Sequence, residues 1–214
     1  MGHVILLGDS IFDNGAYVGG APDVVRQVRG KLPFGWKASL LARDGAVTRS
    51  VLAQLDSLPG DATHLVISAG GNDALGASGV LSQSVGNVAE AVSLLEIAQS
   101  RFAADYARTV EAAVARGLPL ALCTIYDTPP SGADYRLLRT ALAIFNDVIT
   151  REAFARALPL IDLRLICGED EDYANPIEPS ARGGDKIAAA IAAFAAAAMA
   201  GEPPGRSQVF AAPQ

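Results

Sequence analysis

The sequence predicts a three-layer α/β/α sandwich built on a five-stranded parallel sheet. Five short apolar runs alternate with segments of helical periodicity, which is the order expected when each crossover between strands is a helix. The runs are apolar throughout and do not alternate with polar residues, so the strands are expected to be buried on both faces. Because ligands of such sheets bind outside the carboxyl ends of the strands, functional residues are expected in the segments that follow them.

The predicted strands are short runs bounded by turn-forming residues. They cover residues 3–7, 36–42, 63–69, 119–127 and 158–166. The first ends at Gly8, the second at Asp44-Gly45 and the third at Gly70-Gly71. Glycine and aspartate favour turns because glycine adopts positive φ freely and aspartate bonds nearby backbone N–H groups.

Apolar residues spaced three, four and seven apart predict helices between these strands. The helices cover residues 47–58, 88–114, 138–149 and 187–198. The second is either one long helix or two consecutive ones. Residues 15–34 and 76–86 are expected to form loops. These two loops are expected to set substrate selectivity.

Length and composition indicate one globular domain. The chain has 214 residues, of which 50% are hydrophobic and 19% are charged. We expect residues 1–200 to form the domain and residues 201–214 to be a C-terminal tail in which Val209 and Phe210 could dock. The net charge of −6 and the lack of a basic cluster argue against nucleic acids and anionic membranes as partners.

The sequence favours neither a metal site nor secretion. Its two cysteines and two histidines form no metal-binding spacing, so no metal and no other cofactor is expected. The amino terminus lacks the features of a signal peptide, and no run of about 18 large apolar residues predicts a membrane span. A cytoplasmic protein is therefore expected, and its oligomeric state is left open.

Residues suited to acyl transfer follow the first three predicted strands. Ser10 follows the first, Gly45 the second and Asn72 the third, so all three are expected at one edge of the sheet. A serine hydroxyl, backbone N–H groups beside a glycine and an asparagine amide can together form a nucleophile and an oxyanion hole. Ser10 alone is weak evidence, because a serine after a strand is more often a helix N-cap.

Four sequence blocks resemble those of the SGNH/GDSL hydrolase family. They read GDSIFDNG at 8–15, DGAVT at 44–48, GGND at 70–73 and NPIEPSARGG at 175–184. The resemblance implies a flavodoxin-like SGNH-hydrolase fold and a small-molecule carboxylic ester as substrate. It also implies that Ser10 is the nucleophile and that its N–H, the Gly45 N–H and the Asn72 side chain bind the oxyanion. Asp13 and Gly15 match the lipase-type GDSxxDxG form of the first block.

The fourth block departs from the family pattern at two positions. Family members have Asp-x-x-His there, whereas this chain has Asn175 and Glu178. The remaining histidines, His3 and His64, begin the first and third predicted strands. A strand of five or six residues would separate them from Ser10 by roughly 17–20 Å, so neither is positioned as a base.

Glu178 stands in the position of the base. To act as a general base it would need a pKa raised well above about 4.3, by burial or by the carboxylates of Asp9, Asp13 and Asp73. A glutamate has no tautomer to fix, and Asn175 would donate a hydrogen bond to it. The sequence then predicts a Ser–Glu dyad.

Other interpretations stay open at this point. In one, the crevice binds a ligand without turning it over, and Glu178 pairs with Arg182 or with a cation of a partner. In another, the acyl group passes to an alcohol and the protein is an acyltransferase. A metal site of Asp9, Asp13 and Asp73 is a further alternative, although Asp9 and Asp73 equally suit hydrogen bonds to backbone N–H groups in tight turns.

Overall fold

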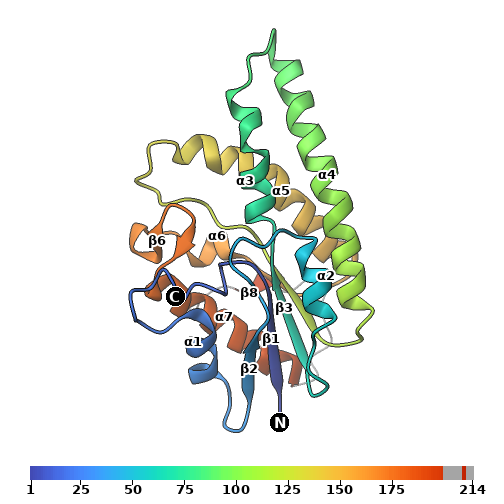
Figure 1. Ribbon diagram of the computed structural model, residues 1–214, viewed down its shortest axis with the longest axis vertical. Helices are drawn as coiled ribbons and strands as arrows, with labels where there is room; N and C mark the ends of the chain where they lie inside the picture. The colour runs from blue at the N-terminus through green and yellow to red at the C-terminus, as the bar shows by residue number, and fades with distance from the viewer. Residues whose placement is uncertain (200–208, 211–214) are drawn as a thin grey trace.

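The computed structural model describes residues 1–199 and 209–210, and a parallel sheet runs through its centre (Figure 1). In spatial order the strands are β2 (Lys37–Leu40), β1 (His3–Gly8), β3 (His64–Ser68), β4 (Leu120–Cys123), β5 (Leu160–Ile161) and β8 (Val209–Phe210). Every neighbouring pair is parallel. All five predicted strands are therefore present, and two residues of the predicted tail add a sixth strand beside β5.

Helices cover both faces of the sheet, which confirms the predicted three-layer class. One face carries α1 (Val24–Lys31), α6 (Leu163–Ile166) and α7 (Ala181–Met199), and the other carries α2 (Ser50–Leu55), α4 (Val88–Val114) and α5 (Tyr135–Ala155). Side chains of β1 alternate between the two cores. Val4 and Leu6 pack into the first, and Ile5 and Leu7 pack into the second.

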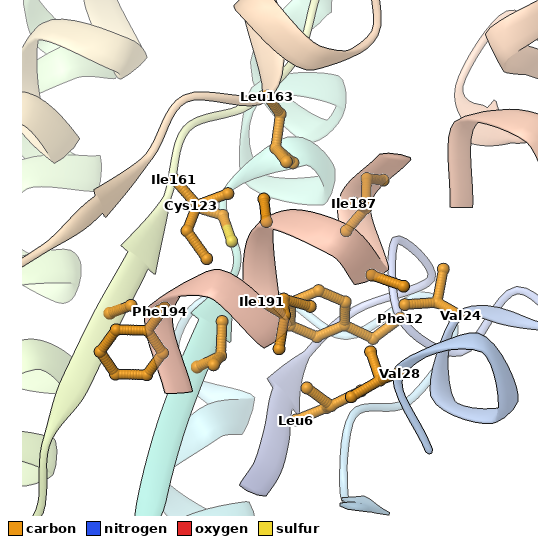
Figure 2. Packing of buried hydrophobic residues seen from close by; sticks show 14 of the residues in the cluster. Leu6, Phe12, Val24, Val28, Cys123, Ile161, Leu163, Ile187, Ile191 and Phe194 are labelled. Atoms are coloured by element: carbon orange, nitrogen blue, oxygen red, sulfur yellow. The ribbon is translucent and has the colours of Figure 1, made fainter. Parts of the chain in front are cut away.

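The helix α7 packs on the sheet through apolar side chains spaced three and four residues apart, as its periodicity predicts. Ile187, Ile191 and Phe194 are buried, and Figure 2 shows them in one cluster with Leu6 of β1 and Val28 of α1. Although α7 is rich in alanine, no helix within residues 1–199 is long and apolar enough to cross a membrane.

The segment predicted as a loop at 15–34 contains α1. Asp23 is its N-cap and accepts a hydrogen bond from Arg26 N at 2.9 Å. The helix buries Val24 and Val28 against α7 and has only eight residues. A periodic pattern is weak over so short a helix, and its stability comes from packing against α7.

The prediction of a strand over 158–166 is wrong after Ile161. There the chain turns into the short helix α6, whose N-cap is Asp162. Its Oδ1 accepts hydrogen bonds from Arg164 N at 3.2 Å and from Thr124 Oγ at 2.9 Å. An aspartate that binds the backbone two residues ahead favours a helix start over a continuing strand.

A helical projection rises from the carboxyl edge of the sheet, at the top of Figure 1. It consists of α3 (Gly71–Ala77), the 3₁₀ helix η1 (Ser78–Ser82) and the first half of α4. α4 is one continuous helix of 27 residues, which decides between the two forms that its periodicity allowed. Its buried residues begin at Phe102, so its first half extends beyond the core.

A two-stranded hairpin before α7 carries Glu178. Its strands are β6 (Tyr173–Asn175) and β7 (Glu178–Pro179). Asp172 immediately precedes the hairpin and is fully buried. Its Oδ2 lies 2.8 Å from Lys186 Nζ and its Oδ1 lies 3.6 Å from Arg182 Nε, both of α7. These ion pairs fasten the hairpin to the first turns of the helix.

Gly183 of the fourth block packs against the backbone of Asp172, just before the hairpin. A Cβ added to Gly183 would lie 2.1 Å from the carbonyl oxygen of Asp172. That carbonyl also accepts a hydrogen bond from Ser180 N at 2.9 Å, so it cannot move away freely. Only glycine therefore lets α7 start this close to the hairpin.

Candidate active site

Ser10 and Gly45 lie in loops at the carboxyl edge, and Asn72 lies in the first turn of α3 at the same edge. They follow β1, β2 and β3, which are adjacent in the sheet. Asn72 Nδ2 donates a hydrogen bond to Ala46 O at 2.9 Å and thereby joins α3 to the loop that carries Gly45. The second hydrogen of this amide is left for a ligand. Ser10 is 6% exposed and lies in the wall of a pocket.

Asp13 and Asp73 hold the loop around Gly45 from two sides. Asp13 Oδ2 accepts a hydrogen bond from Asp44 N at 3.0 Å. Asp73 Oδ2 accepts hydrogen bonds from Thr48 N at 2.8 Å and from Thr48 Oγ at 2.9 Å. Gly45 itself has φ = +74°, which side chains with a Cβ rarely adopt. The two carboxylates thus position the loop that presents the Gly45 N–H.

Asp9 is a buried carboxyl next to the serine, with 2% exposure. Its Oδ1 accepts a hydrogen bond from Ile11 N at 3.1 Å. Burial raises the pKa of Asp9 to about 7; the hydrogen bond from Ile11 opposes this shift, and the negative charges of Glu178 and Asp73 add to it.

The three aspartates do not gather around a common point. Asp9, Asp13 and Asp73 each bind a backbone N–H group, a role that the sequence suggested for Asp9 and Asp73. Among the described residues, no group of three or more His, Cys, Asp and Glu side chains could hold a metal ion.

Glu178 lies beside Ser10 and is 4% exposed. Burial raises the pKa of Glu178 to about 7; a hydrogen bond from the Ser10 side chain lowers it, and the charge of Asp44 raises it further. The oxygen Oε2 is buried without a hydrogen-bond partner in the described part of the chain. A carboxyl with an unused acceptor next to a serine hydroxyl is equipped to take a proton.

The alternative in which Glu178 pairs with Arg182 is wrong. Arg182 instead forms ion pairs with Glu169 and with Asp172. No cation is among the charges that act on the pKa of Glu178. Within the described residues no cation therefore offsets the burial of Glu178, and only the hydrogen bond from Ser10 opposes the rise of its pKa.

Asn175 acts on the turn of the hairpin. Its Oδ1 accepts a hydrogen bond from Ile177 N at 2.9 Å, rather than its amide donating to Glu178 as expected. Tyr126 supports the same turn, because its hydroxyl donates to Ile177 O at 2.9 Å. Both contacts hold the turn of the hairpin that carries Glu178.

Asn14 is a site residue that the sequence reasoning did not single out. It is fully buried, and its Nδ2 donates to Pro179 O at 3.2 Å while its Oδ1 accepts from Val24 N at 3.0 Å. It therefore joins the serine block to the residue that follows Glu178. Its position inside the GDSxxDxG block, between Asp13 and Gly15, was the signal available.

The two histidines lie at the amino ends of β1 and β3, away from the site. His3 Nδ1 is 2.8 Å from Asp61 Oδ1, and its Nε2 is 2.8 Å from Ser39 Oγ. His64 stacks near Trp36, with ring centroids 5.1 Å apart. Neither imidazole takes part in the arrangement around Ser10.

An apolar pocket of about 170 Å³ opens beside Ser10 and Glu178. Its walls come from the projection and from α5, and they include Leu75, Val80, Leu95, Leu138, Leu142 and Phe145. Ser10, Asn72 and the carboxyls of Asp9 and Glu178 are among the polar groups that line this pocket. A concave apolar site with a few convergent polar groups and shifted pKa values has the character of an active site.

Known proteins share this architecture. Solved structures similar to the chain include the extracellular lipase of Streptomyces rimosus, with a TM-score of 0.64, 18% identity and coverage of 92% of this chain and 100% of that one. Phospholipase A1 of Streptomyces albidoflavus NA297 has a TM-score of 0.62 and 17% identity, with 92% and 98% coverage. The acetyl xylan esterase AlAXEase has a TM-score of 0.66 and 15% identity, with 91% and 98% coverage.

At sequence identities of 15–18%, structural similarity establishes the fold only. The family is established by the match of the sequence to a family model. None of the curated proteins matches the chain. The model of the GDSL-like lipase/acylhydrolase family matches residues 6–186, which include all four blocks. The family's members are hydrolases of small-molecule esters, and this chain belongs to the GDSL-like lipase/acylhydrolase family.

Proposed function

We propose that the protein is a carboxylic ester hydrolase that works through an acyl-enzyme on Ser10, with Glu178 as the general base. The observation that carries the proposal is the burial of Glu178 beside the Ser10 hydroxyl, with its pKa raised to about 7. An ordinary histidine has a pKa of about 6.5, so Glu178 is about as strong a base as the residue it replaces. Burial thus supplies the basicity that glutamate normally lacks.

In the first half of the reaction Ser10 Oγ attacks the ester carbonyl carbon and its proton passes to Glu178. The C=O electron pair moves onto the carbonyl oxygen, and the Ser10 N–H, the Gly45 N–H and the free hydrogen of Asn72 Nδ2 bind this oxyanion. The intermediate collapses when the C–O bond to the alcohol breaks. The leaving alkoxide takes the proton back from Glu178.

In the second half a water molecule attacks the acyl-enzyme and gives one proton to Glu178. The oxyanion forms in the same cradle and collapses by breaking the bond to Ser10 Oγ. Ser10 recovers its proton from Glu178, and the carboxylic acid leaves. No tautomer has to be selected, so the neutral Asn175 has only to hold the hairpin turn.

The proposal predicts that kcat/KM for p-nitrophenyl acetate rises with pH and levels off above about pH 7–8. Glu178 accepts a proton only when it is ionised. The acid limb of the profile, which is the pH range over which the rate rises, should therefore be centred near its raised pKa of about 7 and not near the pKa of 4.5 of an ordinary glutamate. Asp9 titrates in the same range and interacts with Glu178, so the limb should be broader than that of one group. Initial rates between pH 4 and 9 measure it.

Ser10→Ala is the control for this profile, and a fluorophosphonate should label Ser10 of the unsubstituted protein covalently. An acid limb centred near pH 4.5 would show that the pKa of Glu178 is not raised, and would remove the observation that carries the proposal. Absence of both ester turnover and fluorophosphonate labelling across the pH range would instead favour the non-catalytic binding protein.

A further inference from the structure

Most of the residues that line the pocket beside Ser10 are apolar and lie outside the proposed catalytic group. Its walls include residues of α3, η1, α4 and α5, together with residues that follow β1, β3 and β4 and residues of the hairpin turn. Leu95 lies in the half of α4 that extends beyond the core, and Leu142 faces the pocket from α5. Both leucines are half-buried, and contact with water costs them free energy. An apolar ligand in the pocket would remove that cost.

The polar end of the pocket carries negative charge without a compensating cation. No lysine or arginine is among the residues that line the pocket in the described part of the chain. Asp9 and Glu178 both lie there, each with a pKa near 7, and Asp73 and Asp44 act on them through their charges. Asp127 also lines the pocket, but it pairs with Arg139 at 3.5 Å and is neutralised.

We propose that this pocket binds the acyl chain of the substrate, that it fits a chain of about six carbons, and that the alcohol or thiol part carries no negative charge. The inference rests on the proposed function and specifies the substrate class of the same site. Apolar walls select the acyl arm, and the uncompensated carboxyls select against an anionic leaving group such as a phosphate ester or coenzyme A.

The cavity volume sets the chain length. An apolar protein cavity of about 150 Å³ takes up one benzene molecule, which has six carbons. The pocket here measures about 170 Å³. Each methylene that enters it is expected to raise kcat/KM about three- to fourfold, from the transfer free energy of a buried CH₂. From acetyl to hexanoyl the gain should be about a hundredfold, and longer chains should gain nothing more.

The first test is a series of p-nitrophenyl esters from acetate to dodecanoate with the unsubstituted protein. A maximum of kcat/KM at or near hexanoate is the expected result. A flat profile, or a maximum at acetate or at dodecanoate, would overturn the proposed pocket. If Ser10-dependent hydrolysis of acetate persists in that case, the proposed function stands and only the acyl pocket fails.

Substitutions at one wall residue should move the maximum in opposite directions. Leu142→Trp fills the pocket and should lower the hexanoate-to-acetate ratio of kcat/KM at least tenfold, whereas Leu142→Ala enlarges it and should shift the maximum to a longer chain. The matched control is Leu137→Trp, on the same helix, because Leu137 is exposed and does not line the pocket. Equal profiles for the two tryptophan variants would contradict the proposal.

The charge prediction is tested with three hexanoyl thioesters that differ in the thiol: thiocholine, N-acetylcysteamine and coenzyme A. These thiols are cationic, neutral and anionic, and each is detected as it is released. At low salt we expect kcat/KM to fall in that order, with at least tenfold between the first and the last, and the difference should shrink as salt screens the carboxyls. The neutral thioester matches the cationic one in size, whereas coenzyme A is much larger, so the loss of the difference at high salt is what assigns the effect to charge. An anionic thioester that is hydrolysed as well as the neutral one would refute this part.

Discussion

Replacing Glu178 with glutamine is expected to lower kcat/KM for p-nitrophenyl acetate by about 10³-fold at pH 8. Glutamine keeps the shape and the burial of the side chain but cannot accept a proton, and general base catalysis contributes about 10²–10⁴-fold. Residual turnover above the rate in water would come from the oxyanion hole. Glu111→Gln is the matched control, because Glu111 is exposed on α4.

The double variant sharpens this prediction. A nucleophile and its base act as a unit, so Ser10→Ala combined with Glu178→Gln should be no slower than the slower of the two single variants. Additive losses would mean that Glu178 acts independently of the serine. A Glu178→Gln variant with unchanged kcat/KM would exclude the dyad outright.

The same glutamine variant should be more stable than the unsubstituted protein at pH 8. The pKa of Glu178 is raised from 4.5 to about 7 in the folded state, so folding favours the protonated form. Stability is therefore lost as pH rises from about 4.5 through 7, and glutamine avoids that loss. The gain should be about 1–3 kcal/mol at pH 8 and close to zero at pH 4. Urea unfolding at both pH values measures it.

This stability measurement separates two causes of low activity. A variant that loses turnover and gains stability has lost a functional group, whereas one that loses both has been damaged. If the Glu178→Gln variant is less stable at pH 8, burial of the ionised carboxylate does not destabilise the folded protein.

The second large effect is expected at Asp172, where alanine should lower the free energy of unfolding by about 2–4 kcal/mol. The side chain is fully buried, binds Lys186 and Arg182, and accepts a hydrogen bond from Glu169 N at 3.1 Å. Removing one partner of a buried pair costs about 3–5 kcal/mol, and Lys186 keeps some contact with water, which reduces the loss. Urea denaturation gives the value.

Asp147→Ala is the matched control for that experiment. Asp147 pairs with Arg151 at 2.7 Å, but both side chains are exposed, and such pairs contribute about 0–1 kcal/mol. Asp172→Ala should also reduce kcat, because the ion pairs fasten the hairpin that carries Glu178. Equal effects of the two alanine substitutions on stability would show that burial of Asp172 does not matter.

The fold was predictable because its signals are local. Continuous apolar runs identified β1 to β5, and once a parallel sheet is assumed, the segments after adjacent strands must meet at one edge. The predictions failed for two short helices, α1 and α6, which depend on contacts with other parts of the chain. α1 depends on packing against α7, and α6 begins where Asp162 caps a turn instead of extending β5.

The predicted cellular location and the predicted division into a domain and a tail are not tested by the fold. The cytoplasmic location stays a prediction, because the described residues show only that no helix could span a membrane. The same holds for the division into a domain and a tail, since the structure describes only Val209 and Phe210 of the latter, as β8.

The sequence by itself determined the family, the positions of Ser10, Gly45 and Asn72, and the replacement of the expected histidine by Glu178. These follow from residue identity and order along the chain. Whether Glu178 has the raised pKa that the proposed base requires depends on the tertiary structure, because that pKa depends on what buries the side chain. That environment comes from distant segments: Asn14, for example, binds Pro179 across 165 residues. The apolar pocket likewise needs four separate helices to assemble, and no local pattern records their packing.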